Sequence, residues 1–587
     1  MKLAYILSFI VAVNAALLGI DFGTAYTKAI LVAPGVNYDL LLTPESKRKS
    51  VAGLAITNEG DDIIRHFDTQ AQAMCVRRPE SCIMGVKSAL DEEGKVNVEI
   101  AAMLFSELKR RAELHWKETS ELAGSVEDAV ISVPAHWNAI TRSSIVDAAS
   151  VAGLNVIGLV NEGLAVGIDY AQRKGNNAEE LIPEEYHLVF DCGADETKAS
   201  LIWMHNNVSS TSVELVNYAN TELVSGNEFT LVVRDMILDI LPESARDDAR
   251  VMNRVWMSAE RAKIVLSANN EARVSLEYQD VDYNTVLLRE EFENRVGKKV
   301  NESIEIMLDE VLNGFEGELS SVQIVGGSVR VPLVQTKLSE YFGNIVSKHV
   351  NADESCVFGT TYYGAYLLGI TRKRTVEIIP SSIHQYQFQY NAGNVTEMYI
   401  EPFEMEHVDE IFVNIIENDQ IIQNVTVTVP TFNNTAVFGM EFDLDPIGTV
   451  KIVSMKMNET SLPMKSTRLG MSASEKSTIS RKLRAMDTGD VMRETLAEAK
   501  NQLEAALYAL RELGDEEFVS EQLEWLEYED PTLEEVYIRR EVVNKKMDAH
   551  LPHVVEEVVE EDIKETVEET LDTEEEVPEE APSHDEL

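Results

Sequence analysis

Short apolar runs alternate with stretches of helical spacing between about residue 16 and residue 372. One example is EDAVISVPAHWN (127–138), an apolar run followed by a turn; the next segment, AITRSSIVDAASVAGL (139–154), has helical spacing and ends at Gly153, a suitable C-cap. Another is HLVFDCGADETKASLIWM (187–204), in which an acid–glycine turn separates two apolar runs. Repeated alternation of strands and helices predicts an α/β domain over residues 16–372.

Beyond about residue 374 the pattern changes. Residues 375–470 are rich in Val, Ile, Thr and Phe and alternate in polarity, which predicts a β-sandwich module. Residues 474–550 have helical periodicity and predict an α-helical bundle. The first helix of this bundle places on one side the residues Leu496, Ala499, Leu503, Ala506, Leu507 and Leu510. Residues 551–587 are rich in Glu, and their charge density predicts a disordered acidic tail.

Both ends of the chain resemble targeting signals. MKLAYILSFIVAVNA (1–15) has a lysine, a short apolar run and small residues near Ala15, the form of a cleaved secretory signal peptide. The last four residues, HDEL (584–587), match the signal that returns soluble proteins to the endoplasmic reticulum. Together they predict localisation in the endoplasmic reticulum lumen. Apart from the signal peptide, no apolar stretch is long enough for a membrane span, and the net charge of -50 argues against nucleic acid as a partner.

Glycosylation acceptors and cysteines fit the same compartment. Six Asn residues begin N-x-S/T triplets, and we expect only part of them to carry glycans: Asn207, Asn301, Asn394, Asn424, Asn433 and Asn458. The four cysteines are too few for a disulfide framework in a chain of 587 residues. Cys75 and Cys82 either form a bridge or remain free thiols, and the sequence leaves both alternatives open.

The segment LLGIDFGTAYTKAILV (17–32) contains the first candidate for binding chemistry. Two apolar runs flank an acid, a glycine and two hydroxyl groups, and a second glycine, Gly19, lies within the first run. Gly19 and Gly23 allow the backbone to approach a ligand closely, and Asp21 is suited to a hydrated Mg²⁺. An ordinary tight hairpin explains the same residues equally well.

Six segments that follow one another along the chain support the interpretation of this turn as a ligand-binding site. They are GIDFGTAYT, VPAHWNAITRSSIVDAASVAGLNVIGLVNEGLAVGIDYA, VFDCGADET, SAERAKIVLS, IVGGSVRVPLVQ and NADESCVFGTTYYGAYLLG. Their order and spacing resemble the ATPase domain of the 70-kDa heat-shock chaperone superfamily, which has an actin-like two-lobed fold. The β module and the helical segment continue the resemblance to about residue 550.

The resemblance implies a nucleotide, ATP or ADP, held with Mg²⁺ between two hairpins. Gly19 to Thr24 and Asp191 to Gly193 would face the phosphates, and Asp21 and Asp191 would approach the metal through waters. Glu162 is similar to the family's acid near the attacking water. Lys87 falls where active members place a lysine on the transferred phosphate, a position that stabilises developing charge. The alternatives are a helix cap for Glu162 and a solvated surface lysine for Lys87.

The same resemblance implies the residues around the base and ribose. Glu260, Lys263 and Ser267 lie on one face of a predicted helix. Arg330 would lie flat against the adenine, although a surface ion pair would also explain it. The full set implied on this side of the site is Gly226, Glu260, Lys263, Ser267, Gly327, Ser328, Arg330 and Asp353.

Several positions depart from the family pattern. The second hairpin has Asp195 and Glu196, which bring negative charge toward phosphates, and Glu196 stands at a family threonine. Lys198 replaces an aspartate that usually helps with the metal. Ile264 replaces an arginine that stacks on adenine, and Gly163 replaces a proline. These departures predict nucleotide binding with at most weak ATP hydrolysis.

The C-terminal half indicates a branch of the superfamily. The acidic-leucine linker of ordinary members is absent, and TRKRTVEIIPSSIHQYQF (371–388) stands in its place. The helical region with EWLEYED (524–530) resembles the large exchange-factor branch, most of all the 170-kDa glucose-regulated, hypoxia-induced chaperones of the endoplasmic reticulum.

This resemblance implies a nucleotide exchange factor for the lumenal 70-kDa chaperone that assists protein translocation and folding, with partner contacts expected around residues 516–529. The alternatives are an ATP-hydrolysing foldase and a passive holdase, each of which would bind unfolded polypeptides directly. A sugar kinase or an actin-like filament protein would share the two-lobed fold but not the β module, helical bundle and retrieval signal.

Overall fold

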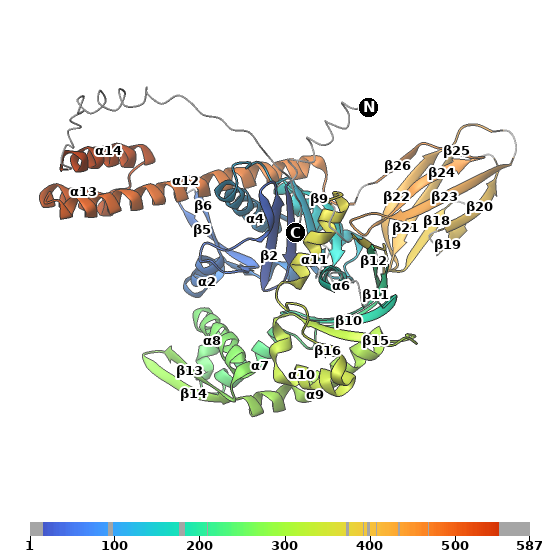
Figure 1. Ribbon diagram of the computed structural model, residues 1–587, viewed down its shortest axis with the longest axis horizontal. Coiled ribbons are helices and arrows are strands. Elements are labelled where there is room, and N and C mark those ends of the chain that lie inside the picture. The colour runs from blue at the N-terminus through green and yellow to red at the C-terminus, as the bar shows by residue number, and fades with distance from the viewer. Residues whose placement is uncertain are drawn as a thin grey trace, which may run out of the picture. The chain divides into compact units, whose positions relative to one another are not determined.

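The computed structural model describes residues 16–550 except for short gaps (Figure 1). The gaps are residues 61, 92–97, 175–181, 208, 371–374, 391–392, 396–398, 407, 433–434 and 468. The predicted signal peptide (1–15), the predicted acidic tail with its retrieval sequence (551–587) and the acceptor Asn433 lie outside the described residues. Contacts divide the chain into two compact units, Met1–Thr488 and Gly489–Leu587.

The first unit contains two six-stranded sheets of related topology. In the first sheet the strand order is β3–β2–β1–β8–β9, and β4 pairs with β2. β1 and β2 form an antiparallel hairpin, whereas β8 runs parallel to β1 and β9 parallel to β8. The bounds are β1 (Leu17–Phe22), β2 (Tyr26–Ala33), β3 (Val36–Leu40), β4 (Ser50–Val51), β8 (Asp128–Val133) and β9 (Asn155–Asn161).

The second sheet repeats this arrangement in the order β12–β11–β10–β15–β16, with β17 beside β12. β10 and β11 form the antiparallel hairpin, and β15 and β16 are the parallel strands. The bounds are β10 (Glu184–Cys192), β11 (Thr197–Asn206), β12 (Ser210–Thr221), β15 (Leu319–Val325), β16 (Val346–Ser347) and β17 (Thr375–Ile378). Two sheets of one topology agree with the predicted two-lobed α/β fold.

Two helices lie between the sheets and join the lobes. α6 (Glu162–Lys174) packs on α11 (Ser355–Leu367), and these helices also contact β11 and β1 respectively (Figure 1). One apolar cluster runs from Leu17 and Val130 of the first sheet through Ala165 and Ile168 of α6 to Ile202 of the second. Strands of both lobes therefore pack against α6 in one apolar core.

The remaining helices of the two lobes cover the outer faces of the sheets. α4 and α5 pack at the first sheet, and α7, α8, α9 and α10 share the core of the second. Their bounds are α4 (Val98–Thr119), α5 (Ala139–Val151), α7 (Gly226–Leu238), α8 (Ala249–Ala268), α9 (Arg289–Val311) and α10 (Pro332–Phe342). Short 3-10 helices are η3 (Glu243–Asp247), η4 (Gly327–Arg330) and η5 (Gly343–Ile345).

Each lobe carries a small additional sheet. β13 (Glu271–Tyr278) and β14 (Val281–Leu288) form a hairpin in the second lobe. In the first lobe the strand order is β6–β5–β7, next to α2 and before α3. The bounds are β5 (Gly53–Glu59), β6 (Asp62–Phe67), α2 (Asp68–Arg77), η1 (Pro79–Ser81), β7 (Cys82–Met84) and α3 (Val86–Asp91).

Cys75 and Cys82 are joined in a disulfide, so the bridged alternative is the one that the structure adopts. Their Cα atoms are 5.0 Å apart, within the range that a bridge spans. Cys192 and Cys356 are free. Burial raises the pKa of the Cys192 thiol to about 12, which makes this cysteine unreactive at neutral pH.

The segment predicted to open the β module belongs to the second lobe instead. Thr375–Ile378 forms β17, which pairs in parallel with β12 at the edge of the second sheet. Val376 is buried there among residues of both sheets. The polarity alternation of this segment gave the correct secondary structure but could not identify the sheet, because an edge strand has the same pattern in either place.

The β-rich module that follows consists of two antiparallel sheets. Their orders are β19–β18–β21–β22–β26 and β20–β23–β24–β25. The bounds are β18 (Tyr386–Tyr390), β19 (Gly393–Val395), β20 (Tyr399–Met405), β21 (Glu410–Glu417), β22 (Gln420–Thr428), β23 (Ala436–Leu444), β24 (Val450–Met457), β25 (Thr460–Ser461) and β26 (Met464–Ser466). Both sheets contribute to one core that contains Phe388, Val413 and Phe438.

A buried carboxylate attaches this module to the first lobe. Glu417, which is 1% exposed, accepts a hydrogen bond of 2.6 Å from the backbone N–H of Ala139, the first residue of α5. Tyr386 donates its hydroxyl to the same carboxylate. An anion at a helix N-terminus is stabilised by the unpaired N–H groups and the helix dipole. The contact therefore fixes the module at the beginning of α5.

Three helices follow the β module. They are α12 (Ala473–Glu512), α13 (Glu516–Tyr528) and α14 (Leu533–His550). In the first unit, the start of α12 packs Leu483 and Met486 into the core of the first lobe, and Asp487 pairs with Arg65 at 2.7 Å. In the second unit, Leu503, Leu507 and Leu510 form a core with residues of α13 and α14.

The predicted order of α/β, β-rich and helical parts is confirmed, although the exact domain limits stay a prediction. Among the helices of the described residues, none has both the length and the apolar character that crossing a membrane requires.

Because His187 of β10 is buried, we expect the protein to lose stability in acid. Its Nδ1 lies 2.9 Å from Ser321 Oγ, and burial lowers its pKa to about 4, with Glu185 opposing and Lys174 reinforcing the shift. As the pH falls below about 6.5, the unfolded chain binds a proton that the folded chain excludes, so stability decreases until about pH 4.

We expect His187 to account for about 2 kcal/mol of the stability lost between about pH 7.5 and pH 5. The measurement is the unfolding free energy in urea at both pH values, for the native chain and for His187→Asn. The variant should show a loss smaller by that amount. Equal losses in the two proteins would mean that His187 does not titrate as its burial requires.

Candidate functional site

Two acid–glycine hairpins, one in each lobe, supply the predicted metal-facing aspartates. Asp21 is near the end of β1 and Asp191 near the end of β10. In each hairpin the residue directly across the ladder is a lysine: Lys28 opposite Asp21 and Lys198 opposite Asp191. The two lobes thus present the same pair of residues in the same register.

Asp21 is occupied by partners from its own lobe. Its Oδ2 lies 2.5 Å from Lys28 Nζ, and its Oδ1 accepts a hydrogen bond of 3.3 Å from Ser132 Oγ. Burial works against the charge on Lys28, yet the carboxylate of Asp21 raises the pKa of this lysine above its ordinary value. Asp21 and Lys28 therefore form a charged pair.

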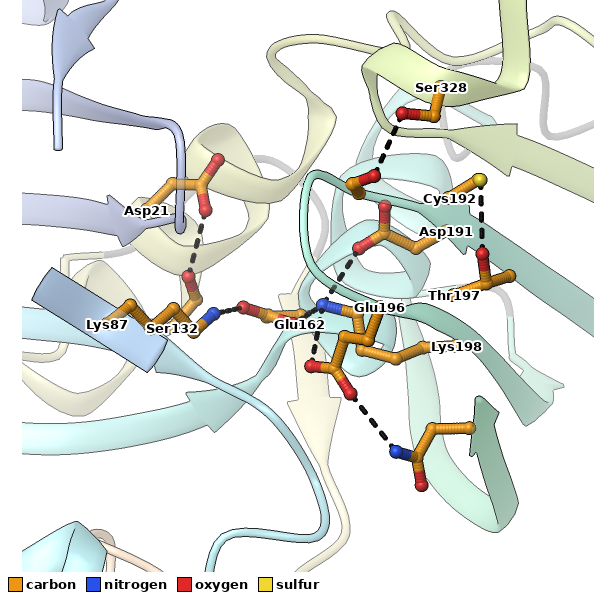
Figure 2. A network of polar contacts seen from close by, with 12 residues as sticks. Asp21, Lys87, Ser132, Glu162, Asp191, Cys192, Glu196, Thr197, Lys198 and Ser328 are labelled. Atoms are coloured by element: carbon orange, nitrogen blue, oxygen red, sulfur yellow. Dashed lines mark hydrogen bonds and ion pairs between the residues drawn. The ribbon is translucent and has the colours of Figure 1, made fainter. Parts of the chain in front are cut away.

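Glu162 is the centre of the site. It is the first residue of α6 and is buried. Figure 2 shows its carboxylate between two ammonium groups: Lys87 from α3 contacts Oε1 and Lys198 from β11 contacts Oε2. Burial alone would raise the pKa of Glu162, but Lys198 and Lys87 together lower it to about 2. Glu162 is therefore ionised, and both of its oxygens are engaged.

Lys87 is itself buried, at 5% exposure, which excludes the surface-lysine alternative. Its ammonium lies 5.7 Å from the centre of the Trp137 ring, a cation–π distance. A lysine of the first lobe and a lysine of the second lobe thus meet on one carboxylate.

Lys198 contacts three carboxylates. Besides Glu162, its Nζ lies 3.4 Å from Asp191 and 3.5 Å from Glu196 (Figure 2). Burial disfavours a charge here, but these carboxylates raise the pKa of Lys198 well above its ordinary value. Asp191 differs, because burial raises the pKa of its carboxyl group against the attraction of Lys198.

The two extra acids of the second hairpin are also held by partners. Asp195 accepts hydrogen bonds from Ser88 Oγ of the first lobe at 2.5 Å and from Asn227 at 3.3 Å. Glu196 accepts one from Asn220 at 3.1 Å (Figure 2). The expected repulsion toward a phosphate is therefore reduced at both positions, and Ser88–Asp195 adds a second bridge between the lobes.

Three residues that are predicted to contact the nucleotide lie together at the second hairpin, namely Gly193, Gly226 and Ser328. The carbonyl of Gly193 accepts hydrogen bonds of 2.9 Å from both Gly226 N–H and Ser328 Oγ. Gly226 begins α7, so its N–H belongs to a helix N-terminus, a favourable place for an anion. In the structure this N–H donates its hydrogen bond to the backbone carbonyl of Gly193 instead.

The residues predicted on the ribose and base fall into two groups, one at Gly226 and one beside α10. On α8, Lys263 Nζ lies 2.6 Å from Glu260 and 2.9 Å from the carbonyl of Gly226. Ser267 and Arg330 line a cavity of ≈ 530 Å³ beside α10, together with Pro332, Gln335, Thr336, Ser339 and Glu340. The structure brings these elements together without assigning them a ligand.

Arg330 forms an ion pair, which is the alternative to a contact with adenine that the sequence left open. Its guanidinium lies 2.6 Å from Asp353, and the two side chains are 51% and 37% exposed. Ile264, which the resemblance aligns with a family arginine, is 61% exposed. Gly327 belongs to η4 with Arg330. The role of this side of the site stays a prediction.

Gly19 has a packing role. A Cβ at this position would overlap the side chain and backbone of Thr361 on α11. The absence of a side chain is therefore required by close packing of α11 on β1, whether or not a ligand is bound. Gly23 and Thr24 lie in the turn between β1 and β2, as expected.

No role for Lys28 was predicted from the sequence, although a signal was present. Lys28 follows Asp21 by the same interval at which Lys198 follows Asp191. Comparison of GIDFGTAYTK with FDCGADETK would have revealed this repeat.

The described residues contain no group of three or more His, Cys, Asp or Glu side chains placed to hold a metal ion directly. The expected approach of Mg²⁺ to Asp21 and Asp191 through water stays a prediction. The glycan acceptors Asn207, Asn301, Asn424 and Asn458 are exposed, and their occupancy also stays a prediction.

The sequence profile of the Hsp70 protein family matches residues 61–401, more than half of the chain. The chain therefore belongs to the Hsp70 family, as the segments of the two lobes predicted.

Individual relatives agree with the predicted branch. Heat shock protein 70 homolog LHS1 of Candida glabrata is 27% identical, with 90% of this chain and 72% of the relative covered. LHS1 of Saccharomyces cerevisiae is 24% identical, with 87% and 70% covered. Hypoxia up-regulated protein 1 of Xenopus laevis is 24% identical, with 76% of each covered.

The structure explains why a glycine follows Glu162. A Cβ on Gly163 would overlap the side chain of Ser200 on β11, so neither proline nor alanine fits at this point. We expect Gly163→Ala to destabilise the protein by about 1–3 kcal/mol, the usual cost of overpacking.

A double-mutant cycle in chemical denaturation tests this contact. Ser200→Gly removes the opposing side chain, so the cost of Gly163→Ala should largely vanish when it is measured in the Ser200→Gly background. Gly297→Ala on α9 is the control, because nothing lies within 4 Å of its Cβ; it should be neutral or stabilise by up to about 1 kcal/mol. An unchanged cost in both backgrounds would rule out the clash.

Proposed function

We propose that this chain is an ATP-binding co-chaperone of the endoplasmic reticulum lumen. It acts as a nucleotide exchange factor for the resident 70-kDa chaperone and so assists protein translocation and folding. The observation that carries the proposal is the carboxylate of Glu162, which is held by an ammonium group on each oxygen.

This arrangement argues against efficient hydrolysis. A carboxylate that activates water needs a free oxygen and a pKa near the working pH. The Glu162 carboxylate has neither, because Lys87 and Lys198 occupy both oxygens and lower its pKa. A bound nucleotide would then serve as a structural ligand of the two lobes rather than as a substrate.

A structural ligand suits a protein that acts through its shape. The nucleotide would sit between lobes that are already bridged by Lys87–Glu162–Lys198 and by Ser88–Asp195. The β module is attached to α5 through Glu417. A chain held in one shape can favour the open form of a partner's nucleotide cleft by binding that form more tightly, which releases the partner's ADP.

The compartment is supported by two kinds of observation. The sequence has a predicted signal peptide and ends in HDEL. The Cys75–Cys82 disulfide is of a kind that persists in oxidising compartments and is rare in the cytosol.

Direct binding of unfolded polypeptide is the second candidate function. Large apolar side chains of the β module are between 41% and 53% exposed, namely Phe412, Ile421, Val437 and Val453. Exposed apolar surface of this kind is suited to apolar segments of a client. A foldase would in addition require hydrolysis that responds to J-domain proteins.

Two assays on the full-length protein separate these functions. We expect single-turnover hydrolysis of bound ATP to be slow and indifferent to J-domain proteins. We expect release of labelled ADP from the lumenal 70-kDa chaperone to accelerate by at least about tenfold when the ATP-bound protein is added. Rapid, J-domain-stimulated turnover without any effect on ADP release would instead identify a foldase. Suppression of aggregation that is unaffected by ATP would identify a holdase.

The attachment of the β module gives a further prediction. Glu417→Ala removes the acceptor of the Ala139 N–H, so the module should loosen and the acceleration of ADP release should fall by about fivefold or more. Glu441→Ala is the matched control, since Glu441 is exposed on the same module and pairs with Lys456. If both variants retain native acceleration, the attachment has no part in exchange.

A further inference from the structure

We propose that Lys28 and Lys198 are built-in counter-cations of the nucleotide site, so that this chain binds nucleoside di- and triphosphates without requiring Mg²⁺. The inference rests on the proposed function in one respect, namely that the cleft between the lobes binds a nucleotide.

The geometry of the two hairpins carries the inference. Each aspartate expected to face a hydrated metal has a lysine directly across the strand ladder. Lys28 Nζ lies 2.5 Å from Asp21, and Lys198 Nζ lies 3.4 Å from Asp191. The arrangement is present in both lobes, so it repeats with the duplicated topology and does not depend on one irregular loop.

Charge balance points the same way. The network contains four carboxylates and three ammonium groups: Asp21, Glu162, Asp191 and Glu196, with Lys28, Lys87 and Lys198. Without a metal ion these groups carry one net negative charge, and Asp195 of the second hairpin, which is held by Ser88 and Asn227, adds another. With aspartate in place of Lys198, as the family resemblance implies for other members, the network would be more negative by two charges, the charge of one Mg²⁺.

A divalent cation does not fit the side chains as they lie. A hydrated Mg²⁺ between Asp21 and Asp191 would share those carboxylates with ammonium groups that are themselves largely buried. Like charges repel strongly where water is excluded, and Lys198 cannot move away without leaving Glu162. The aspartates are thus already neutralised by groups of the protein.

Lys198, together with Lys87, provides hydrogen-bond donors that suit a polyphosphate. Ammonium groups form short, charge-assisted hydrogen bonds with phosphate oxygens. Lys87 and Lys198 approach Glu162 from opposite lobes, so their ammonium groups come together where the two hairpins face each other (Figure 2). A phosphate group between the hairpins would meet these two ammonium groups, while the carboxylates around it are already paired with lysines.

Calorimetric titration of the full-length protein with ADP, in EDTA and in excess Mg²⁺, tests the inference. ADP is the probe because it cannot be hydrolysed at a γ-phosphate. We expect the two dissociation constants to agree within about threefold. If ADP binds at least about tenfold more weakly in EDTA, the inference is overturned while nucleotide binding, and the proposed function, survive. If ADP binds in neither buffer, the proposed function fails and the inference fails with it.

Variants of Lys198 sharpen the test. Lys198→Asp should acquire a requirement for Mg²⁺, with ADP affinity at least about tenfold higher in Mg²⁺ than in EDTA. Lys198→Met, which removes the charge at similar length, should weaken binding in EDTA and recover part of it in Mg²⁺. Retained metal independence in a folded Lys198→Asp protein would contradict the assignment.

Lys456→Asp is the matched control, because it reverses the charge of a strand lysine that pairs with a carboxylate in the β module. Its ADP affinity should equal that of the native chain in both buffers. If Lys198→Asp fails to fold, the dissociation constants of ADP for the native chain in the two buffers still test the inference. The shift of the melting temperature that ADP causes in each buffer gives an independent readout.

Discussion

The structure depends on one buried interaction, the carboxylate of Glu162 between the ammonium groups of Lys87 and Lys198. Three elements meet at this point: α3 of the first lobe, α6 between the lobes and β11 of the second. A buried charge is costly unless it is paired and hydrogen-bonded, so each member of the triad requires the other two. The interaction that joins the lobes is also the one that occupies the acid expected to assist hydrolysis.

The duplicated topology explains how such a centre arises. Each lobe contains an antiparallel hairpin next to parallel strands, and each hairpin ends a central strand in an aspartate. The fold therefore places these two hairpin positions, which are aspartates in this chain, at the cleft. This chain has a lysine across each hairpin, directly opposite the aspartate, so the charge of each aspartate is balanced within its own hairpin. Family membership and the predicted loss of hydrolysis are thus compatible.

Much of the architecture follows from patterns that are local in the chain. The strand–turn–strand segments around Asp21 and Asp191 and the helix after Asn138 have short-range signals, and they fold as expected. The position of Lys28 opposite Asp21 depends only on the register of one hairpin, and the repeat shared with Lys198 indicates it. The pairing of β17 with β12 depends on distant strands, which polarity alternation cannot identify. Arg330 illustrates the same limit, because an exposed ion pair and a ligand contact have one sequence signature.

A crystal structure of the protein grown with ATP and Mg²⁺ tests the role of Glu162 most directly. We expect an intact triphosphate between the hairpins, with Glu162 still in contact with both lysines and no metal ion between the aspartates of the two lobes. A hydrolysed nucleotide, or a hydrated magnesium ion in place of the Lys198 ammonium, would contradict this expectation.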